Sequence, residues 1–236
     1  SYDIKIKKKY STINAIAGTI TQQGLEKLKD HPLVKSIQYD NQVRKALDES
    51  IPLVNADDTW TLKFNEQNLT GDGISVCVID TGINYNHSAL GNGWGNKVIG
   101  GFDFVNNDSD PWDDEGHGTH VAGIIAGEND TYRGVAPDSK LLAVKVLDDT
   151  GSGADSDVAA GVDWCVNNSL QYNISIISMS IGVTGSKHND STYCDYFTTP
   201  ASMNNAWNNG ILSFVASGND GFSDGINYPA CGSGAI

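Results

Sequence analysis

The sequence contains no long apolar run. Its longest mostly apolar stretches, such as residues 211–216, are far shorter than the roughly 20 residues that a helix needs to cross a bilayer. No internal repeat and no low-complexity stretch is present. The sequence therefore predicts no membrane segment in this chain, and its 236 residues are enough for one sizeable core and a small accessory unit.

Basic residues are scarce after residue 47. Residues 48–236 contain six Lys or Arg against 25 Asp or Glu, whereas residues 1–47 contain nine against four. An acidic body of this kind argues against nucleic acid as a partner. The asymmetry fits either an acidic solubilising surface with a basic arm or the docking of two complementary segments, and we prefer the second interpretation.

Residues 1–47 show a short mixed pattern. Residues 2–9, 13–20 and 33–39 alternate between apolar and polar side chains, which is typical of strands, and residues 22–29 favour a helix. We therefore predict a small α+β domain with the order strand, strand, helix, strand.

Residues 48–236 have a different pattern, in which nearly continuous apolar segments alternate with helical stretches. The expected strands are residues 74–79, 140–147, 174–181 and 211–216, and the expected helices are residues 117–127, 156–168 and 199–208. Strands that are apolar on both faces belong in a parallel sheet covered by helices. We therefore expect an α/β fold of three layers, with a mostly parallel sheet and helices on both faces. The junction with the first domain is expected within residues 42–55, a charged segment that contains Pro52.

Chemically active side chains lie where several expected strands end. Asp80 directly follows one strand, and His117 opens a helix whose first turns are rich in small residues. Because ligands bind outside the carboxyl ends of parallel strands, we expect a site at this edge. A lone Asp in such a place is often only a turn residue. His120 lies three residues after His117, and two histidines on one helix suggest a metal site. However, a two-histidine zinc helix has its ligands four residues apart with a Glu between them. We therefore interpret His120 as a hydrogen-bonded structural residue.

Five segments together resemble the subtilisin-like serine proteases, in that family's order and approximate spacing. They are Val78-Ile79-Asp80-Thr81-Gly82, His117-Gly118-Thr119-His120-Val121-Ala122-Gly123, Gly134-Val135-Ala136-Pro137, Met179-Ser180-Ile181-Gly182 and Ser217-Gly218-Asn219. The resemblance implies a subtilisin-like catalytic domain over residues 48–236. Residues 1–47 resemble the later half of the family's inhibitory propeptide, a ferredoxin-like α+β domain.

The resemblance implies a role for each residue of the catalytic group. Asp80 resembles the carboxylate that orients the imidazole, His117 the general base, and Asn219 the side-chain donor of the oxyanion hole. The family's nucleophile lies in a Gly-Thr-Ser-Met-Ala segment well beyond the oxyanion Asn, and the seventeen residues after Asn219 contain no such segment. We therefore expect the nucleophilic Ser to be absent from this chain, and the chain alone to be inactive and marginally stable.

The same resemblance implies where a protein substrate binds. An extended peptide of the substrate would add as a strand between two segments. These segments match Gly151, Ser152 and Gly153 on one side and Ser180, Ile181 and Gly182 on the other. A specificity pocket would be walled by the second segment and by Ala216, Ser217 and Gly218, whose small side chains leave room for a sizeable apolar group. A flexible loop without a ligand is the alternative for residues 151–153.

Four cysteines allow two expectations. Cys77 lies in an apolar strand and Cys165 in a helix, so we interpret both as buried thiols rather than metal ligands. Cys194 and Cys231 lie in loops that flank the Asn219 region, and similar family members carry Cys in both places. The resemblance therefore implies a Cys194–Cys231 disulfide and, with it, an oxidising compartment and secretion.

Clustered carboxylates precede His117. Asp108, Asp110 and Asp113 are candidate calcium ligands, because hard oxygen ligands suit this ion. However, Ala89 stands where one calcium site of the family has an Asp, and a solvated acidic loop is the preferred interpretation. No cofactor is otherwise required.

Three functions of different class agree with these features. The preferred one is a secreted serine endopeptidase zymogen that cleaves proteins or peptides and is inhibited by its own propeptide. The alternatives are a noncatalytic relative that binds peptides in the same groove, and a structural component of a cell surface.

Overall fold

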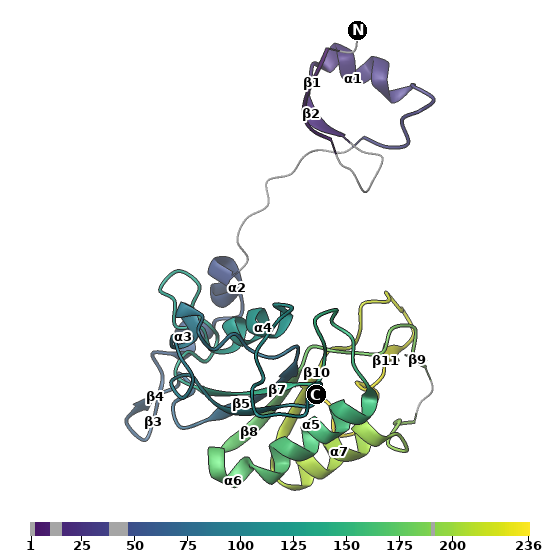
Figure 1. Cartoon of the computed structure of the whole chain (residues 1–236). Helices are drawn as coiled ribbons and strands as arrows, with labels where there is room; N and C mark the ends of the chain where they lie inside the picture. Colours follow the sequence, from purple (N-terminus) through teal and green to yellow (C-terminus); the bar gives the residue numbers. More distant parts are fainter. Residues whose placement is uncertain (1–2, 10–15, 38–46, 190–191) are drawn as a thin grey trace. The chain divides into compact units, whose positions relative to one another are not determined.

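The computed structural model describes residues 3–9, 16–37, 47–189 and 192–236, in two compact units, Ser1–Lys45 and Ala46–Ile236 (Figure 1). The first unit contains β1 (Ile4–Lys9), β2 (Ile16–Ile20) and α1 (Gln22–Lys29). The two strands pair antiparallel. The helix begins after Thr21, whose hydroxyl oxygen accepts a hydrogen bond from the amide of Gly24 at 3.1 Å and caps the first turn.

The expected third strand of this unit is wrong for the residues that can be judged. Residues 33–37 form a turn and irregular backbone, and residues 38 and 39 lie outside the described residues. The side chain of Leu33 is 88% exposed. Alternation alone does not make a strand, because a strand also needs a pairing partner, and residues 33–37 pair with neither β1 nor β2.

The second unit is built around five parallel strands in the order β10-β8-β5-β7-β6. These strands are β5 (Ser75–Asp80), β6 (Val98–Asp103), β7 (Lys140–Lys145), β8 (Ile174–Met179) and β10 (Leu212–Val215). The main helices are α4 (His117–Ala126), α5 (Asp155–Asn167) and α7 (Thr198–Asn208). The smaller elements are α2 (Leu47–Leu53), α3 (Ala56–Thr59), β3 (Lys63–Phe64), β4 (Gln67–Asn68), η1 (Ser88–Leu90), α6 (Ser169–Tyr172), β9 (Lys187–His188) and β11 (Ile226–Asn227).

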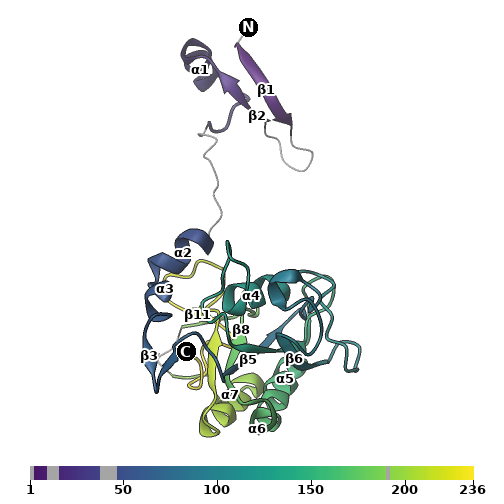
Figure 2. The ribbon, with the colours of Figure 1, turned by 90° about the vertical axis from the view of Figure 1, so that its left-hand side faces the viewer.

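Helices cover both faces of the sheet, which confirms the three-layer α/β architecture. Helix α4 lies on one face and helices α5 and α7 lie on the other (Figures 1 and 2). The central strand β5 serves both cores, because successive side chains of a strand point to opposite faces. Val76 and Val78 pack with Val121 of α4, whereas Cys77 and Ile79 pack in the cluster that includes α5 and α7.

Two features of the second unit differ from the sequence pattern. Strand β6 was not expected, because two glycines interrupt its apolar residues; a side chain at Gly101 would meet the carbonyl oxygen of Ala143 at 2.1 Å. The expected junction at residues 42–55 is helical from residue 47, since α2 buries Ile51 and the start of α3 buries Ala56. Residues 42–46 lie outside the described residues.

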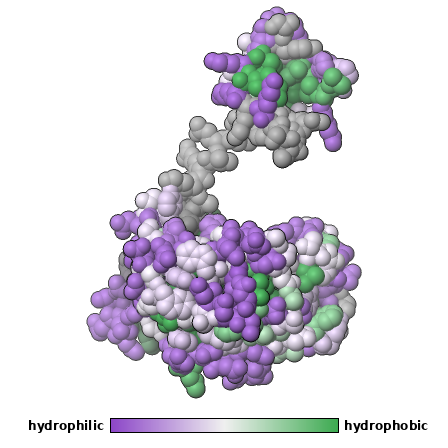
Figure 3. Space-filling model, in the orientation of Figure 1, coloured by the Kyte–Doolittle hydropathy of each residue, from purple (hydrophilic) through white to green (hydrophobic). Residues whose placement is uncertain are grey.

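The surface shows where apolar residues remain exposed. On the face drawn in Figure 3 the second unit is mostly hydrophilic, with small separate apolar areas, and a larger apolar area lies on the first unit. The exposed large apolar side chains of the first unit are Ile6, Ile16, Leu33 and Ile37. None of the helices in the described part of the chain combines the length and apolar character required to cross a membrane.

Candidate active site

Asp80 is the last residue of the central strand β5 and is fully buried. Its Oδ1 accepts a hydrogen bond from the amide of Thr81 at 2.8 Å. Its Oδ2 is also buried and has no partner among the described residues. Such an unsatisfied buried group is costly and uncommon in folded proteins, so Asp80 is not an ordinary turn residue.

His117 is the first residue of α4 and lies against Asp80. The distance between His117 Nδ1 and Asp80 Oδ1 is 2.7 Å. The carboxylate is closed off from solvent, whereas the imidazole is 46% exposed. Two residues that are 37 positions apart in the sequence therefore form one dyad with a buried and an open end.

The pKa values of both residues of the dyad are raised, for different reasons. Burial raises the pKa of Asp80 above its ordinary value of 3.8, and the hydrogen bonds from His117 and Thr81 oppose that change. The hydrogen bond to Asp80 raises the pKa of His117 above its ordinary value of 6.5, against the effect of burial. The charges of Asp80, Glu115 and Asp113 act in the same upward direction. The arrangement therefore strengthens the imidazole as a base and stabilises its cation.

A glycine lets α4 approach β5 this closely. A side chain at Gly118 would lie 2.2 Å from the carbonyl oxygen of Gly82 and 3.1 Å from Cβ of Asp80. The amide of Gly118 donates to the hydroxyl oxygen of Thr81 at 2.9 Å. The small residues after His117 thus serve close packing at the dyad.

Asp113 joins the loop before α4 to the turn after β5. Its Oδ1 accepts from Thr81 Oγ1 at 2.9 Å and from the amide of Gly116 at 2.8 Å. Its Oδ2 accepts from the amide of Thr119 at 2.9 Å and from that residue's hydroxyl. Both oxygens are therefore occupied by donors of the chain itself.

These contacts do not support the proposed calcium ligands. Asp113 has no free oxygen for a metal, Asp110 Oδ1 accepts from the hydroxyl of Tyr85 at 2.7 Å, and Asp108 Oδ1 accepts from the amide of Asp110 at 2.8 Å. Within the described ranges, no group of three His, Cys, Asp or Glu residues is arranged to hold a metal ion. His120, which we expected to be hydrogen-bonded, has an exposed side chain.

The predicted substrate segments follow three strands of the sheet: β8 and β10 lie side by side, and β7 lies on the other side of β5. Residues 151–153 lie in the loop after β7, residues 180–182 follow β8, and residues 216–219 follow β10. The carboxyl ends of these parallel strands share the edge at which Asp80 ends β5. The structure therefore brings the predicted segments to one edge of the sheet.

Local packing fixes the backbone of the last of these segments. The amide of Ala216 donates to the carbonyl oxygen of Met179 at 3.0 Å, which joins the ends of β10 and β8. Gly218 has φ +102°, and a side chain there would meet Cγ of Asn227 at 2.4 Å. The side chain of Asn219 is exposed, whereas the next residue, Asp220, accepts from the amide of Gly185 at 2.7 Å.

The cysteines form two disulfides. Cys194–Cys231 is confirmed. The interpretation of Cys77 and Cys165 as thiols is wrong, because they form a second disulfide that joins β5 to α5, with Cα atoms 6.2 Å apart. Burial was read correctly from the sequence, but periodicity does not reveal which residue lies opposite across the layer.

Lys145, the last residue of β7, also belongs to the surroundings of the dyad, although no motif of the sequence marks it. It pairs in register with Asp80 of β5, and its side chain is only 1% exposed. A charged residue in an otherwise apolar strand could have drawn attention to it, because a buried cation requires hydrogen-bond and ion-pair partners.

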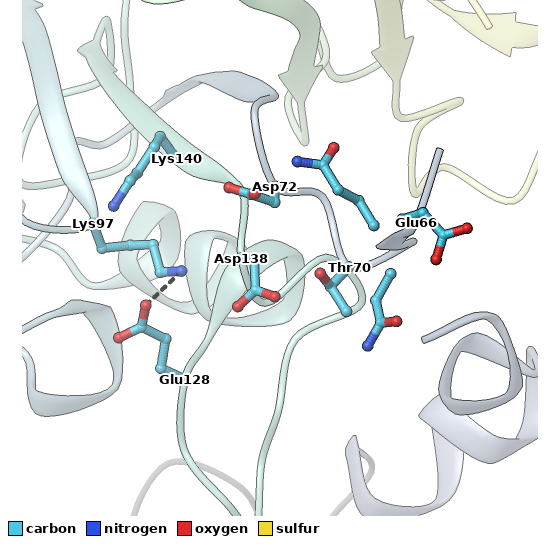
Figure 4. Close-up of a pocket in the computed structure, with 9 residues that line it drawn as sticks. Glu66, Thr70, Asp72, Lys97, Glu128, Asp138 and Lys140 are labelled. Atoms are coloured by element: carbon cyan, nitrogen blue, oxygen red, sulfur yellow. Dashed lines mark ion pairs between the residues drawn. The ribbon is translucent and has the colours of Figure 1, made fainter. Parts of the chain in front are cut away.

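A separate hollow of about 630 Å³ lies away from the dyad (Figure 4). It is lined by charged and polar side chains, including Glu66, Asp72, Asp138 and Lys140. In Figure 4 the buried Lys97 points toward Glu128, with which it forms an ion pair of 2.7 Å. The hollow contains no residue of the dyad.

Comparison with known proteins gives matches to proteases. A sequence profile described as the Subtilase family matches residues 71–236. The Thermostable alkaline protease of Halalkalibacterium halodurans is 36% identical over 244 residues, which cover 100% of this chain and 59% of that protein. Serine protease AprX of Bacillus subtilis is 35% identical over 229 residues, which cover 92% of this chain and 48% of that protein.

A solved structure agrees with these relatives. Sphericase matches with a TM-score of 0.59 and 32% identity, over 77% of this chain and 57% of that chain. This chain therefore spans about half of the length of the proteins that it matches. The profile match covers well over half of the chain, and it includes Asp80, His117 and Asn219. The chain thus belongs to the Subtilase family.

Proposed function

We propose that the protein to which this chain belongs is a serine endopeptidase that cleaves peptide bonds through an Asp-His-Ser triad. Asp80 and His117 supply two members, and the nucleophilic Ser lies outside residues 1–236. The observation that carries the proposal is the contact of 2.7 Å between a fully buried carboxylate and a half-exposed imidazole.

In this proposal each member of the dyad has a distinct task. Asp80 accepts a hydrogen bond from Nδ1 of His117, which leaves Nε2 as the basic nitrogen at the exposed end of the imidazole. His117 takes the proton of the serine hydroxyl during attack and returns it to the leaving amine, while Asp80 stabilises the imidazolium. The raised pKa of His117 supports this assignment, since an imidazole of higher pKa accepts a proton more readily.

Binding of the substrate uses the other loops at the same edge. Asn219 donates its side-chain amide to the oxyanion that forms on the substrate carbonyl. The substrate lies as an extended strand between residues 151–153 and residues 180–182, and the small residues 216–218 form a wall of the specificity pocket. Two observations support these roles: Asn219 is exposed, and all three segments follow strands that flank β5 in the parallel sheet, β7 on one side and β8 and β10 on the other.

The remaining assignments concern the rest of the protein. The first unit, Ser1–Lys45, contains a β-strand pair and a helix, and we assign residues 1–47 to the later half of an inhibitory propeptide. Two disulfides support secretion into an oxidising compartment. The chemistry requires no cofactor, and a calcium ion is not part of the proposal.

Labelling by a fluorophosphonate, which reacts with activated serines, tests the function. The complete reading frame should encode a Gly-Thr-Ser-Met segment downstream of residue 236, and its product should be labelled. His117→Ala should slow labelling by about 10⁴-fold or more, because the general base is lost. His120→Ala, which removes an exposed histidine of the same helix, is the control and should be labelled at the original rate.

Two outcomes would contradict the proposal. One is a reading frame without such a serine segment, which would favour the noncatalytic peptide-binding alternative. The other is labelling of the His117→Ala variant at the rate of the unchanged protein.

A further inference from the structure

Lys145 is a buried cation next to the dyad. Its ammonium group donates three hydrogen bonds, to the carbonyl oxygens of Thr81 and Leu147, each at 2.8 Å, and to Asp114 Oδ1 at 2.7 Å. An ammonium group has three protons to donate. Every donor of Lys145 is therefore used, and the carboxylate of Asp114 compensates its charge.

The three partners belong to three segments of the site. Thr81 follows Asp80 in the turn after β5, and Asp114 lies in the loop that leads to His117. Leu147 lies in the segment that leads from β7 to residues 151–153. The side chain of Lys145 therefore contacts three segments at once: the turn that follows Asp80, the loop that precedes His117, and the segment that leads to residues 151–153.

The contact with Thr81 matters most for the dyad. The amide of Thr81 donates to Asp80 Oδ1, the same oxygen that contacts His117. The hydroxyl of Thr81 accepts from the amide of Gly118 in α4 and donates to Asp113. A shift of the Thr81 backbone would therefore displace the Asp80 carboxylate and the start of α4 relative to each other.

We propose that Lys145, neutralised by Asp114, is a positioning residue that holds the Thr81 turn and thereby keeps the carboxylate of Asp80 in contact with His117. The contribution of Lys145 to catalysis rests on the proposed function. The contact that it maintains is a property of this chain and is measured without cleavage of any substrate.

The sheet contains a matched control lysine. Lys97 directly precedes β6, is also 1% exposed, and pairs at 2.7 Å with Glu128, whose exposure of 47% equals that of Asp114 (Figure 4). The two ion pairs therefore have the same burial and length. Lys97 precedes β6 and so lies at the amino ends of the parallel strands, whereas Lys145 is the last residue of β7 and lies at their carboxyl ends.

The test is the titration of His117 by NMR in the 236-residue chain, with Lys145→Met compared with Lys97→Met. Asp80, Glu115 and Asp113 are the charged groups that raise the pKa of His117 in the unchanged chain. Removal of a nearby cation would by itself raise that pKa further. Loss of positioning has the opposite sign, because it weakens the hydrogen bond to Asp80. We expect Lys145→Met to lower the pKa by about 0.5 units or more, and Lys97→Met to leave it unchanged.

A second pair of variants applies if Lys145→Met does not fold. Asp114→Asn keeps the size of the side chain at a half-exposed position, and Glu128→Gln is its counterpart at Lys97. Because removal of an anion by itself lowers the pKa of His117, this second pair is read by the NMR signal of the proton on Nδ1 of His117. The signal should leave its hydrogen-bonded position in Asp114→Asn and keep it in Glu128→Gln. An unchanged or raised pKa in the folded Lys145 variant, or an unchanged Nδ1 proton signal in Asp114→Asn where that decides, overturns the proposal, as does an equal change in the Lys97 or Glu128 variant. None of these outcomes bears on the fluorophosphonate test, so failure of the two proposals can be told apart.

Discussion

At the scale of single residues, the dyad depends on Gly118, because a larger residue would not fit there. Gly118 lies where a methyl group would overlap the backbone at Gly82, whereas Gly123, five residues later in the same helix, has no atom within 4 Å of such a group. Gly118 is therefore required for the close approach of α4 to β5. Gly123 has no such role and only lowers the stability of the helix, as glycine ordinarily does.

Alanine substitutions test this difference. Gly118→Ala should lower the free energy of unfolding by about 1–3 kcal/mol, because the backbone has to move away from β5. Gly123→Ala should raise it by about 0.5–1 kcal/mol through better helix propensity. Urea unfolding of both variants checks the prediction, and an equal effect of the two substitutions would show that the close approach is not real.

Asp113 makes the fold sensitive to acid. Burial raises the pKa of Asp113, but the hydrogen bonds from Thr119, Gly116 and Thr81 together lower it below the ordinary value of 3.8. A lowered pKa in the folded state contributes stability that is present above the unfolded pKa and is lost as the pH falls through the folded pKa.

Asp113→Asn should remove this contribution. We expect the free energy of unfolding to fall by about 2–3 kcal/mol at pH 6, because several donors lose their acceptor, and to fall less between pH 6 and pH 3 than in the unchanged chain. Asp138→Asn, at an exposed carboxylate, should change stability by less than about 0.5 kcal/mol at either pH. A variant with the full acid sensitivity of the unchanged chain would contradict the role of Asp113.

Residues were predictable from the sequence where a motif fixes them. Asp80 and His117 stand in segments whose spacing resembles a family, and the structure brings them into contact. Lys145 carries no such motif, since its partners Thr81, Leu147 and Asp114 come together only through the register of β5 with β7 and the loop before α4. Asp113 was singled out for its charge, but its role follows from donors supplied by other segments.

At the scale of elements, buried parallel strands were the easiest to predict. The expected strands at residues 74–79, 140–147, 174–181 and 211–216 correspond to β5, β7, β8 and β10. Continuous apolar runs of this length leave few alternatives. Strand β6 was missed because its glycines weaken the strand signal, although the close approach of Ala143 requires one of them.

The disulfide between β5 and α5 ties the strand that ends in Asp80 to the helical layer. Cys77 and Cys165 are 88 positions apart, and Cys194 and Cys231 are 37 apart. If the cross-links act by limiting the unfolded chain, the longer loop contributes more.

Paired alanine substitutions test that ranking. Removal of Cys77 and Cys165 together should lower the free energy of unfolding by about 4.5 kcal/mol, and removal of Cys194 and Cys231 by about 4 kcal/mol. Urea unfolding, with mass analysis to confirm that the remaining bridge is oxidised, checks this. Loss of less stability at the longer bridge than at the shorter one would contradict the ranking.

At the scale of the whole molecule, the two units differ in the sign of their net charge. The unit Ser1–Lys45 contains nine basic and four acidic residues, and Ala46–Ile236 contains six and 25. The excess of carboxylates in the second unit repels itself in the folded state. Screening by salt weakens this repulsion.

Salt should therefore stabilise the chain at neutral pH. A rise from about 0.01 to about 0.3 M sodium chloride should raise the melting temperature by about 2–4 °C, which corresponds to about 1 kcal/mol. The effect should shrink as the pH falls from 7 toward 4.5, because protonation of carboxylates reduces the negative charge of the second unit. A melting temperature at pH 7 that falls or stays constant with salt would show that self-repulsion is not significant.

The proposed chemistry depends on the contact between Asp80 and His117, and titration of the His117 imidazole by NMR in the unchanged chain and in Asp80→Asn tests that contact. We expect a pKa above 6.5 in the unchanged chain and a clear fall in the variant. The raised pKa also contributes stability that is fully present below about pH 6.5 and is lost as the pH rises through the folded pKa. A His117 pKa at or below 6.5 that is the same in both proteins would show that Asp80 does not hold the imidazole.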